Sequence, residues 1–219
     1  MHSQIDLKAL KQKVYREINQ DGLSELFIGI FFICFASIRI NAGVNQPSYS
    51  YTIGFIASLL LLIFIFSFKY IREHFTYPRI GYADQEGKLS WSYIFLFVIP
   101  VAVYPTLINL MYRHGVNIWI IEMCLRWSPV FFGLLLVLYF QDKMYKSGNK
   151  LYSLFAIISV ISGLVLSIIK FTYNILGIIF FWYIMGGLFF FYGLVKLIRF
   201  IYKYPRPAKP MNESGNATL

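Results

Sequence analysis

Cysteine, histidine and charged residues are scarce in this sequence of 219 residues. It holds 2 cysteines, 3 histidines and 14% charged residues. Both cysteines, Cys34 and Cys124, lie inside apolar stretches, where a small polarizable core residue is favoured over a disulfide or a metal ligand. The histidines are scattered along the chain, which argues against a metal site built from them.

The sequence also lacks the short motifs of several enzyme classes. It contains no GxxxxGK[ST] segment for nucleotide phosphates, and no HExxH, CxxC or GxSxG. Residues 147–150 and 167–170 match the S-x-x-K motif, but the other motifs of that enzyme class are missing, so we interpret both matches as coincidental. Since no cluster of acid, base and nucleophile is visible, we expect neither enzymatic activity nor a cofactor.

Acidic residues are half as numerous as basic ones, 10 against 20, which gives a net charge of +10. Such an excess could indicate nucleic-acid binding, but the basic residues form no single run. They flank apolar segments, as in membrane proteins, and they suit the anionic headgroups of lipids. We therefore expect a lipid bilayer with anionic lipids as the partner, and no nucleic acid.

Apolar residues make up 58% of the chain and concentrate in six stretches. A helix of about 20 such residues crosses the roughly 30 Å hydrocarbon core of a bilayer. The sequence therefore predicts an all-α polytopic integral membrane protein with six transmembrane helices, at residues 23–40, 51–68, 91–112, 116–140, 151–169 and 171–200. The chain divides into a segment 1–22, a six-helix membrane domain 23–204 and a disordered tail 205–219.

The basic residues collect on every second connection between these stretches, and 16 of the 20 fall on one side. By the positive-inside rule, this bias predicts a plasma-membrane protein with both termini in the cytoplasm. The first twenty residues are polar, and no signal-peptidase cleavage pattern follows the first apolar stretch. We therefore expect the first span to remain in the protein as a signal anchor. Residues 5–18 predict an N-terminal amphipathic helix, which either lies in the inner interface or packs on the protein's own cytoplasmic loops.

Two short segments resemble a known group of proteins. They are Asp21-Gly-Leu-Ser-Glu-Leu-Phe-Ile-Gly29 and Tyr77-Pro-Arg-Ile-Gly-Tyr82. Both are similar to segments of uncharacterised prokaryotic polytopic membrane proteins, which show a DGL…G first span and a cytoplasmic P-R-x-G-Y segment. The resemblance covers roughly the first 90 residues and implies a membrane location without implying an activity. It is incomplete, because Ala83-Asp84 stands where that group often has Val-Lys.

Charged residues inside the predicted spans are candidates for a binding site, because a charge at the bilayer centre costs at least about 2.5–3.5 kcal/mol. Glu122 and Arg126 are four residues apart and share one helical face. Arg39, at the outer end of the first span, could reach the depth of Glu122. We predict that Arg39, Glu122 and Arg126 form a net positive cluster that binds an anionic ligand or a lipid headgroup. The alternative is a structural ion pair between helices, with Arg39 extending to the interface.

Two further features lie at the ends and contacts of the predicted helices. Asp21 and Glu25 share a face at the inner end of the first span, where they could attract cations or pair with Arg79. Alternatively, they are ordinary acids that favour a helix N-terminus. Gly186 and Gly187 in the sixth span predict close approach of a neighbouring helix, with a hinge as the alternative.

Three functions stay open. The first is a small permease-like or accessory transport subunit for a small solute or anionic ligand, motivated by Pro100 and Pro105 in the third span and by the charged fourth span. The second is a non-transporting scaffold or sensor, which would meet a protein partner at the cytoplasmic face through residues 70–90. The third, ranked last, is a membrane-embedded enzyme that acts on lipids.

Overall fold

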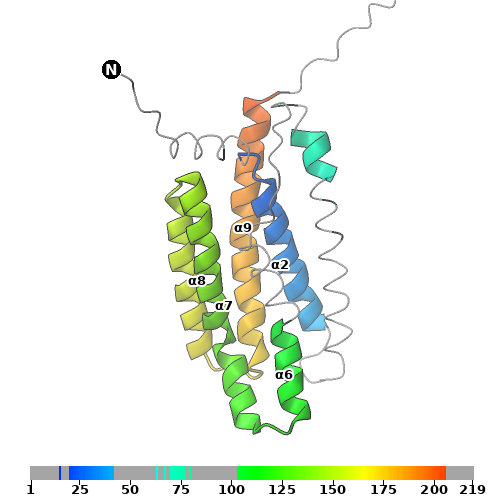
Figure 1. Ribbon diagram of the computed structural model, residues 1–219, viewed down its shortest axis with the longest axis vertical. Helices are drawn as coiled ribbons and strands as arrows, with labels where there is room; N and C mark the ends of the chain where they lie inside the picture. The colour runs from blue at the N-terminus through cyan, green and yellow to red at the C-terminus, as the bar shows by residue number, and fades with distance from the viewer. Residues whose placement is uncertain are drawn as a thin grey trace, which may run out of the picture.

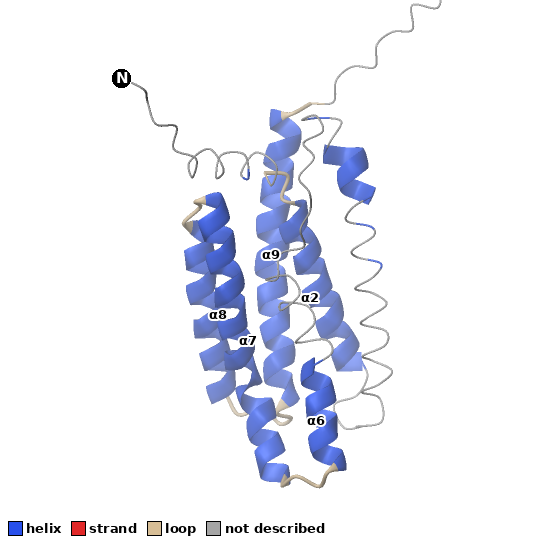
Figure 2. Ribbon diagram, viewed as in Figure 1, coloured by secondary structure: helices blue, strands red, loops and turns tan. Residues whose placement is uncertain are grey.

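A computed structural model describes Tyr15, residues 20–41, Ile63, Ser67, residues 70–76, Arg79 and residues 103–205. Every element in these ranges is helical (Figure 2). The elements are α2 (Leu23–Asn41), the short π-helix η2 (Arg72–Thr76), α6 (Tyr104–Arg113), α7 (Ile118–Ser147), α8 (Leu151–Ile168) and α9 (Ile175–Lys203). Four of them, α2, α7, α8 and α9, are long and apolar enough to cross a membrane. The predicted helical class is confirmed, and these four helices fit a membrane protein.

The four long helices coincide with four of the six predicted spans: residues 23–40, 116–140, 151–169 and 171–200. Of the predicted span 91–112, only the end is described, as the ten-residue α6. The span 51–68 lies outside the described residues apart from Ile63 and Ser67, and the segment 5–18 does so apart from Tyr15. The count of six spans, the N-terminal helix and the disordered tail therefore stay predictions.

Helix α7 runs to Ser147, seven residues past the predicted end of its span at residue 140. The helix stops at Gly148, whose φ of 66° is the left-handed conformation that ends many helices. Its N–H donates to the Met144 carbonyl oxygen at 2.7 Å. Apolar content alone therefore marks the membrane segment of α7 but misses its polar last two turns.

The long helices pack as two antiparallel pairs, α2 with α9 and α7 with α8 (Figure 1). Glycines bring the backbones of each pair close together. A Cβ atom at Gly29 of α2 would lie 2.4 Å from the Phe190 nitrogen, and one at Gly193 of α9 would lie 2.3 Å from the Leu26 nitrogen. Small residues of this kind replace the hydrophobic effect as the means of helix association in lipid.

Glycines also bring the backbones of α7 and α8 close together. A Cβ atom at Gly133 would lie 2.7 Å from the Ser159 carbonyl oxygen, and one at Gly163 would lie 2.6 Å from that of Pro129. In the other pair, Gly186 lies against Gly29, so its predicted role in close packing is confirmed. For Gly187, no described residue lies within 4 Å of the place where its Cβ would be, so its role in close packing stays a prediction.

Aromatic side chains join the two pairs to each other. Phe132 of α7 contacts Trp182 of α9 with ring centroids 5.2 Å apart, and Phe140 stacks on Phe189 at 5.4 Å. Each such pair contributes about 0.5–1.5 kcal/mol beyond its buried area. The contact between the pairs is thus made mainly by side chains, with one backbone approach at Gly177 of α9, whose Cβ would lie 3.4 Å from the Leu166 carbonyl oxygen of α8. The contact within each pair brings backbones closer still.

Helix α7 continues through Pro129, which has no N–H to donate to the carbonyl of Leu125. The hydroxyl of Ser128 donates to that carbonyl instead, at 2.6 Å. A neighbouring hydroxyl therefore satisfies the acceptor that the proline leaves free, as membrane helices require.

Candidate functional site

A group of charged side chains is buried at the end of the bundle where α2 begins and α9 ends, which we call the Glu25 end. This charged cluster consists of two acids, three bases and three hydroxyls: Asp21, Glu25, Arg72, Lys143, Lys196, Ser24, Thr76 and Tyr152. The side chains come from α2, η2, α7, α8 and α9, and Asp21 lies in the turn just before α2. Asp21, Glu25 and Lys143 are each 1% exposed. Burial of so many ionisable groups is rare and requires that each be paired.

Glu25, in the first turn of α2, lies at the centre of the cluster. One carboxylate oxygen accepts hydrogen bonds from Lys196 Nζ of α9, at 2.9 Å, and from the hydroxyl of Tyr152 of α8. The other accepts from the hydroxyl of Ser24 at 2.8 Å. Because its donors come from α2, α8 and α9, this carboxylate joins the two helix pairs.

Lys143 supplies a second cation near Glu25. It lies in the last two turns of α7, and its charge interacts with the Glu25 carboxylate. The rings of Tyr139 and Tyr15 each lie 5.8 Å from its Nζ atom, within the range of a cation–π contact. Two lysines from different helix pairs thus share one buried acid.

Asp21 holds η2 against the start of α2. The Thr76 hydroxyl donates to one carboxylate oxygen at 3.0 Å, and Arg72 Nε lies 3.6 Å from the same oxygen. The Leu23 N–H donates to the other oxygen at 3.3 Å. Burial raises the pKa of Asp21, an effect that the Arg72 charge and the Thr76 hydrogen bond oppose.

Arg72 therefore takes the place expected for Arg79 as the partner of Asp21. Arg79 instead donates to the Tyr204 carbonyl oxygen at 3.3 Å, and its guanidinium lies 4.4 Å from the centre of the Phe75 ring. Both acids are bound by side chains distant in sequence, so they do more than favour a helix N-terminus.

Two hydrogen bonds connect the helix pairs at this end, and we call them the latch. The Tyr152 hydroxyl of the α7/α8 pair donates to Glu25 of the α2/α9 pair. In addition, Asn149 Nδ2, in the turn between α7 and α8, donates to the Tyr192 hydroxyl of α9 at 3.2 Å. Separation of the two pairs at the Glu25 end would break both bonds.

The residues predicted to form a binding cluster, Arg39, Glu122 and Arg126, lie toward the opposite end of the bundle. Arg126 donates to the carbonyl oxygens of Ser167 and Ile168 at 3.1 and 3.3 Å. It thereby satisfies carbonyls that the end of α8 leaves free. Because its donors are directed to α8, the predicted ion pair with Glu122 is not formed, and Glu122 is exposed.

Arg39 has other partners than Glu122 and Arg126. Its guanidinium lies 5.6 Å from the centre of the Phe35 ring and interacts with Tyr104 of α6. Within residues 20–41 and 103–205, no ion pair joins any two of the three predicted residues. Their binding of an anionic ligand stays a prediction.

Lys143, Lys196 and Tyr152 were not among the residues that the sequence predicted to form a site. Lys196 lies inside the predicted span 171–200, which by itself makes a charged residue a candidate. Lys143 continues the helical face of Phe132, Leu136 and Tyr139, all of which are buried. This spacing was the signal that Lys143 points into the bundle.

No protein-family model, curated protein or solved structure matches the chain. The function is therefore inferred from the geometry of the charged cluster.

Proposed function

We propose that this protein is a small permease-like membrane protein, or an accessory transport subunit, that handles a small anionic solute and is gated at the Glu25 end. The observation that carries the proposal is the buried Glu25 carboxylate, bonded to Lys196 of its own helix pair and to Tyr152 of the other. Buried ion pairs add little to stability, because desolvation offsets their attraction. Within a membrane-spanning helix they are typical of solute and proton pathways.

The packing of the helices suits such a gate. Each pair is held by close backbone contacts at glycines, so each would move as one body. The pairs meet through aromatic side chains and the latch, which separate at a lower cost than backbones in contact. Alternating access in transporters is largely the rocking of one such body against another.

The charges favour an anion as the solute. The cluster contains three bases and two acids, so it has a net positive charge. A carboxylate or phosphate that entered would compete with Glu25 for Lys143 and Lys196.

We also propose that the Glu25 end and both termini face the cytoplasm of a six-span plasma-membrane protein. Basic residues at the Glu25 end support this orientation: Lys146, Lys150, Arg199 and Lys203 lie near the ends of α7, α8 and α9.

A cysteine accessibility experiment tests the orientation. In a chain with Cys34 and Cys124 replaced by serine, a membrane-impermeant maleimide should label Lys170→Cys in intact cells and leave Lys150→Cys unlabelled. Both lysines are exposed at opposite ends of α8, so they are matched. Labelling of Lys150→Cys and not of Lys170→Cys would show that the Glu25 end faces outward, contrary to the proposal.

Transport itself is tested with purified protein in liposomes on a solid-supported membrane. Currents are recorded on addition of acetate, lactate, succinate, glutamate and inorganic phosphate. We expect a current with at least one anion, reduced at least about tenfold in Lys196→Met, because the anion would lose one of the two lysines proposed to bind it, and a tenfold loss of binding corresponds to about 1.4 kcal/mol. The control is Lys146→Met, since Lys146 forms a surface pair with Asp142 at 2.7 Å at the same end. Well-folded protein that gives no current with any of these anions would contradict the proposal.

A scaffold or sensor is the second candidate, because Arg72 and Thr76 attach the segment after the second predicted span to Asp21. In this case a soluble protein should co-purify with the intact chain. Replacement of residues 76–88 by a Gly/Ser linker should abolish that binding, and unchanged binding would exclude the segment as the docking site.

A further inference from the structure

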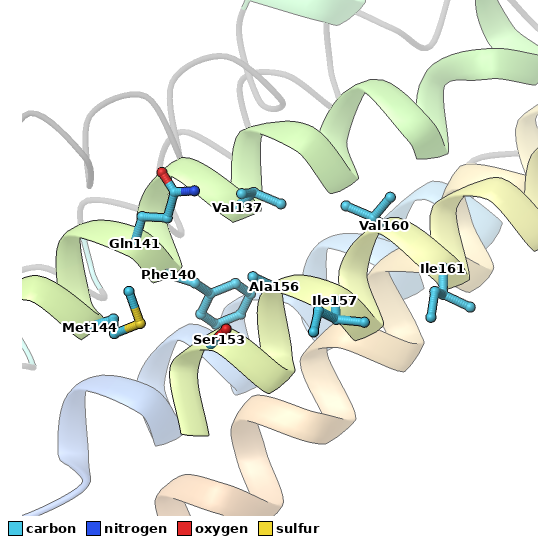
Figure 3. Close-up of a pocket in the computed structure, with 9 residues that line it drawn as sticks. All are labelled: Val137, Phe140, Gln141, Met144, Ser153, Ala156, Ile157, Val160 and Ile161. Atoms are coloured by element: carbon cyan, nitrogen blue, oxygen red, sulfur yellow. The ribbon is translucent and has the colours of Figure 1, made fainter. Parts of the chain in front are cut away.

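An apolar groove of about 420 Å³ runs along the outside of the bundle between α7 and α8 (Figure 3). The α7 wall includes Val137, Phe140 and Met144, and the α8 wall includes Ala156, Ile157 and Ile161. The groove begins next to the close contact of Gly133 with Ser159 and extends toward the Glu25 end. Its larger side chains hold the two helix surfaces apart where the glycines no longer bring them together.

Ile157 and Ile161 of its α8 wall are exposed in the described part of the chain, and both helices are apolar enough to span a membrane, so we infer that the groove faces lipid. Exposed leucines next to it, Leu138 and Leu154, continue this lipid-facing surface. Ser153 and Ile161 on its α8 wall are eight residues apart, or about 12 Å along a helix. One leaflet of hydrocarbon is about 15 Å deep, half of the bilayer core. The length of the groove along α8 is therefore close to the length that one acyl chain spans in a single leaflet.

The polar residues of the groove lie at its Glu25 end. Gln141 and Ser153 line it there, beside Met144 (Figure 3). Lys150 precedes Ser153 by three residues, which places both on one face of the start of α8, and it is exposed. A chain lying in the groove would thus have its headgroup next to a lysine, and a phosphate is the group that such a charge attracts.

We propose that the α7/α8 groove binds one acyl chain of an anionic phospholipid, with the lipid phosphate at Lys150. This site is separate from the charged cluster, and the proposal holds whether or not the protein transports an anion. The occupant is a lipid and not a free phosphate, because the walls of the groove are apolar except for Gln141 and Ser153 at the Glu25 end.

Photo-crosslinking of the unaltered protein provides the first test. Phosphatidylglycerol with a diazirine on one acyl chain is incorporated with the full-length chain into nanodiscs and irradiated, and labelled peptides are identified by mass spectrometry. We expect the label to concentrate in residues 137–144 and 153–161. Label spread evenly over the exposed faces of α7, α8 and α9 would overturn the proposal.

Matched variants provide the second test, read as phospholipid adducts by native mass spectrometry. Ile157→Trp fills the groove, whereas Ile198→Trp makes the same substitution outside it, on α9, at a residue of similar exposure, 45% against 55%. We expect adducts to fall severalfold in Ile157→Trp and to stay unchanged in Ile198→Trp. Gln141→Trp fills the groove from α7 and should repeat the loss if Ile157→Trp folds poorly. Equal adducts in all four proteins would overturn the proposal.

The headgroup is tested with lysines at the two ends of α8. Lys150→Gln should lower the preference for phosphatidylglycerol over phosphatidylcholine about fivefold, the factor expected from one lysine near a lipid phosphate. The control Lys170→Gln, at the opposite end, should leave that preference unchanged. Glycerol 3-phosphate, which has no acyl chain, should form no adduct. An unaltered preference in Lys150→Gln, or an adduct with glycerol 3-phosphate, would overturn the assignment of the site to an anionic lipid.

Discussion

At the scale of single residues, the charged cluster shows how a membrane helix can hold acids out of water. Glu25 accepts hydrogen bonds from Ser24, Tyr152 and Lys196, so both carboxylate oxygens have partners. Asp21 has a weaker ion pair, with Arg72 at 3.6 Å. The two acids thus differ in how completely their charge is compensated, and Asp21 is the one whose protonation should alter stability.

Asp21 should make the protein less stable as the pH rises. Burial raises the pKa of this carboxyl above its ordinary value of 3.8, so the folded state holds the proton more tightly than the unfolded state. Its contribution is therefore most favourable below pH 3.8 and declines as the pH rises through the raised pKa. Chemical unfolding in detergent at a series of pH values should show this decline in the original chain and not in Asp21→Asn. Parallel pH profiles for the two proteins would contradict this prediction.

At the scale of helices, glycines decide which helices pair. The close contacts of Gly29 and Gly193 fix α2 on α9, and those of Gly133 and Gly163 fix α7 on α8. These positions leave no room for a side chain, whereas other positions on the same helices do. The distinction can be measured, because Gly29 of α2 is in close backbone contact and Gly187 of α9 has no described residue near its Cβ position.

We expect Gly29→Ala to destabilise the protein by about 1–3 kcal/mol, the usual cost of overpacking, because its methyl group would meet the Phe190 backbone. Gly187→Ala is the matched control. Its methyl group meets none of the described residues within 4 Å, and alanine favours a helix over glycine by up to about 1 kcal/mol, so stability should stay equal or rise. Thermal unfolding in detergent compares the two. A loss of the same size in both variants would show that close contact at Gly29 is not what holds the pair.

At the scale of the whole molecule, two bodies meet through an aromatic layer and a polar latch at one end. Tyr152→Phe removes the hydroxyl that donates to Glu25 and leaves the ring in place. A hydrogen bond to a charged group contributes about 1.5–3 kcal/mol, so the variant should separate more often at the Glu25 end. Hydrogen–deuterium exchange should then rise at the end of α7 and the start of α8 and stay unchanged at the Arg126 end. Unchanged exchange at both ends would exclude Tyr152 as part of a gate.

The sequence predicts the helices of this molecule better than their arrangement. Four of the predicted apolar stretches correspond to α2, α7, α8 and α9. They can be recognised in the sequence because a helix that crosses a bilayer needs about 20 consecutive apolar residues. Which face of each helix points inward is hidden, since lipid-facing and buried residues are both apolar. Phe131 is 48% exposed, for example, and its neighbour Phe132 is 1% exposed. A lysine on the buried face, such as Lys143, is the kind of residue that breaks this ambiguity.

The serine beside the proline of α7 has a consequence for how that helix can move. The Leu125 carbonyl depends on a hydroxyl that turns about one single bond, and a rotation of this bond leaves the acceptor open without altering any backbone torsion. A bend at this point would therefore start with the reorientation of one small side chain.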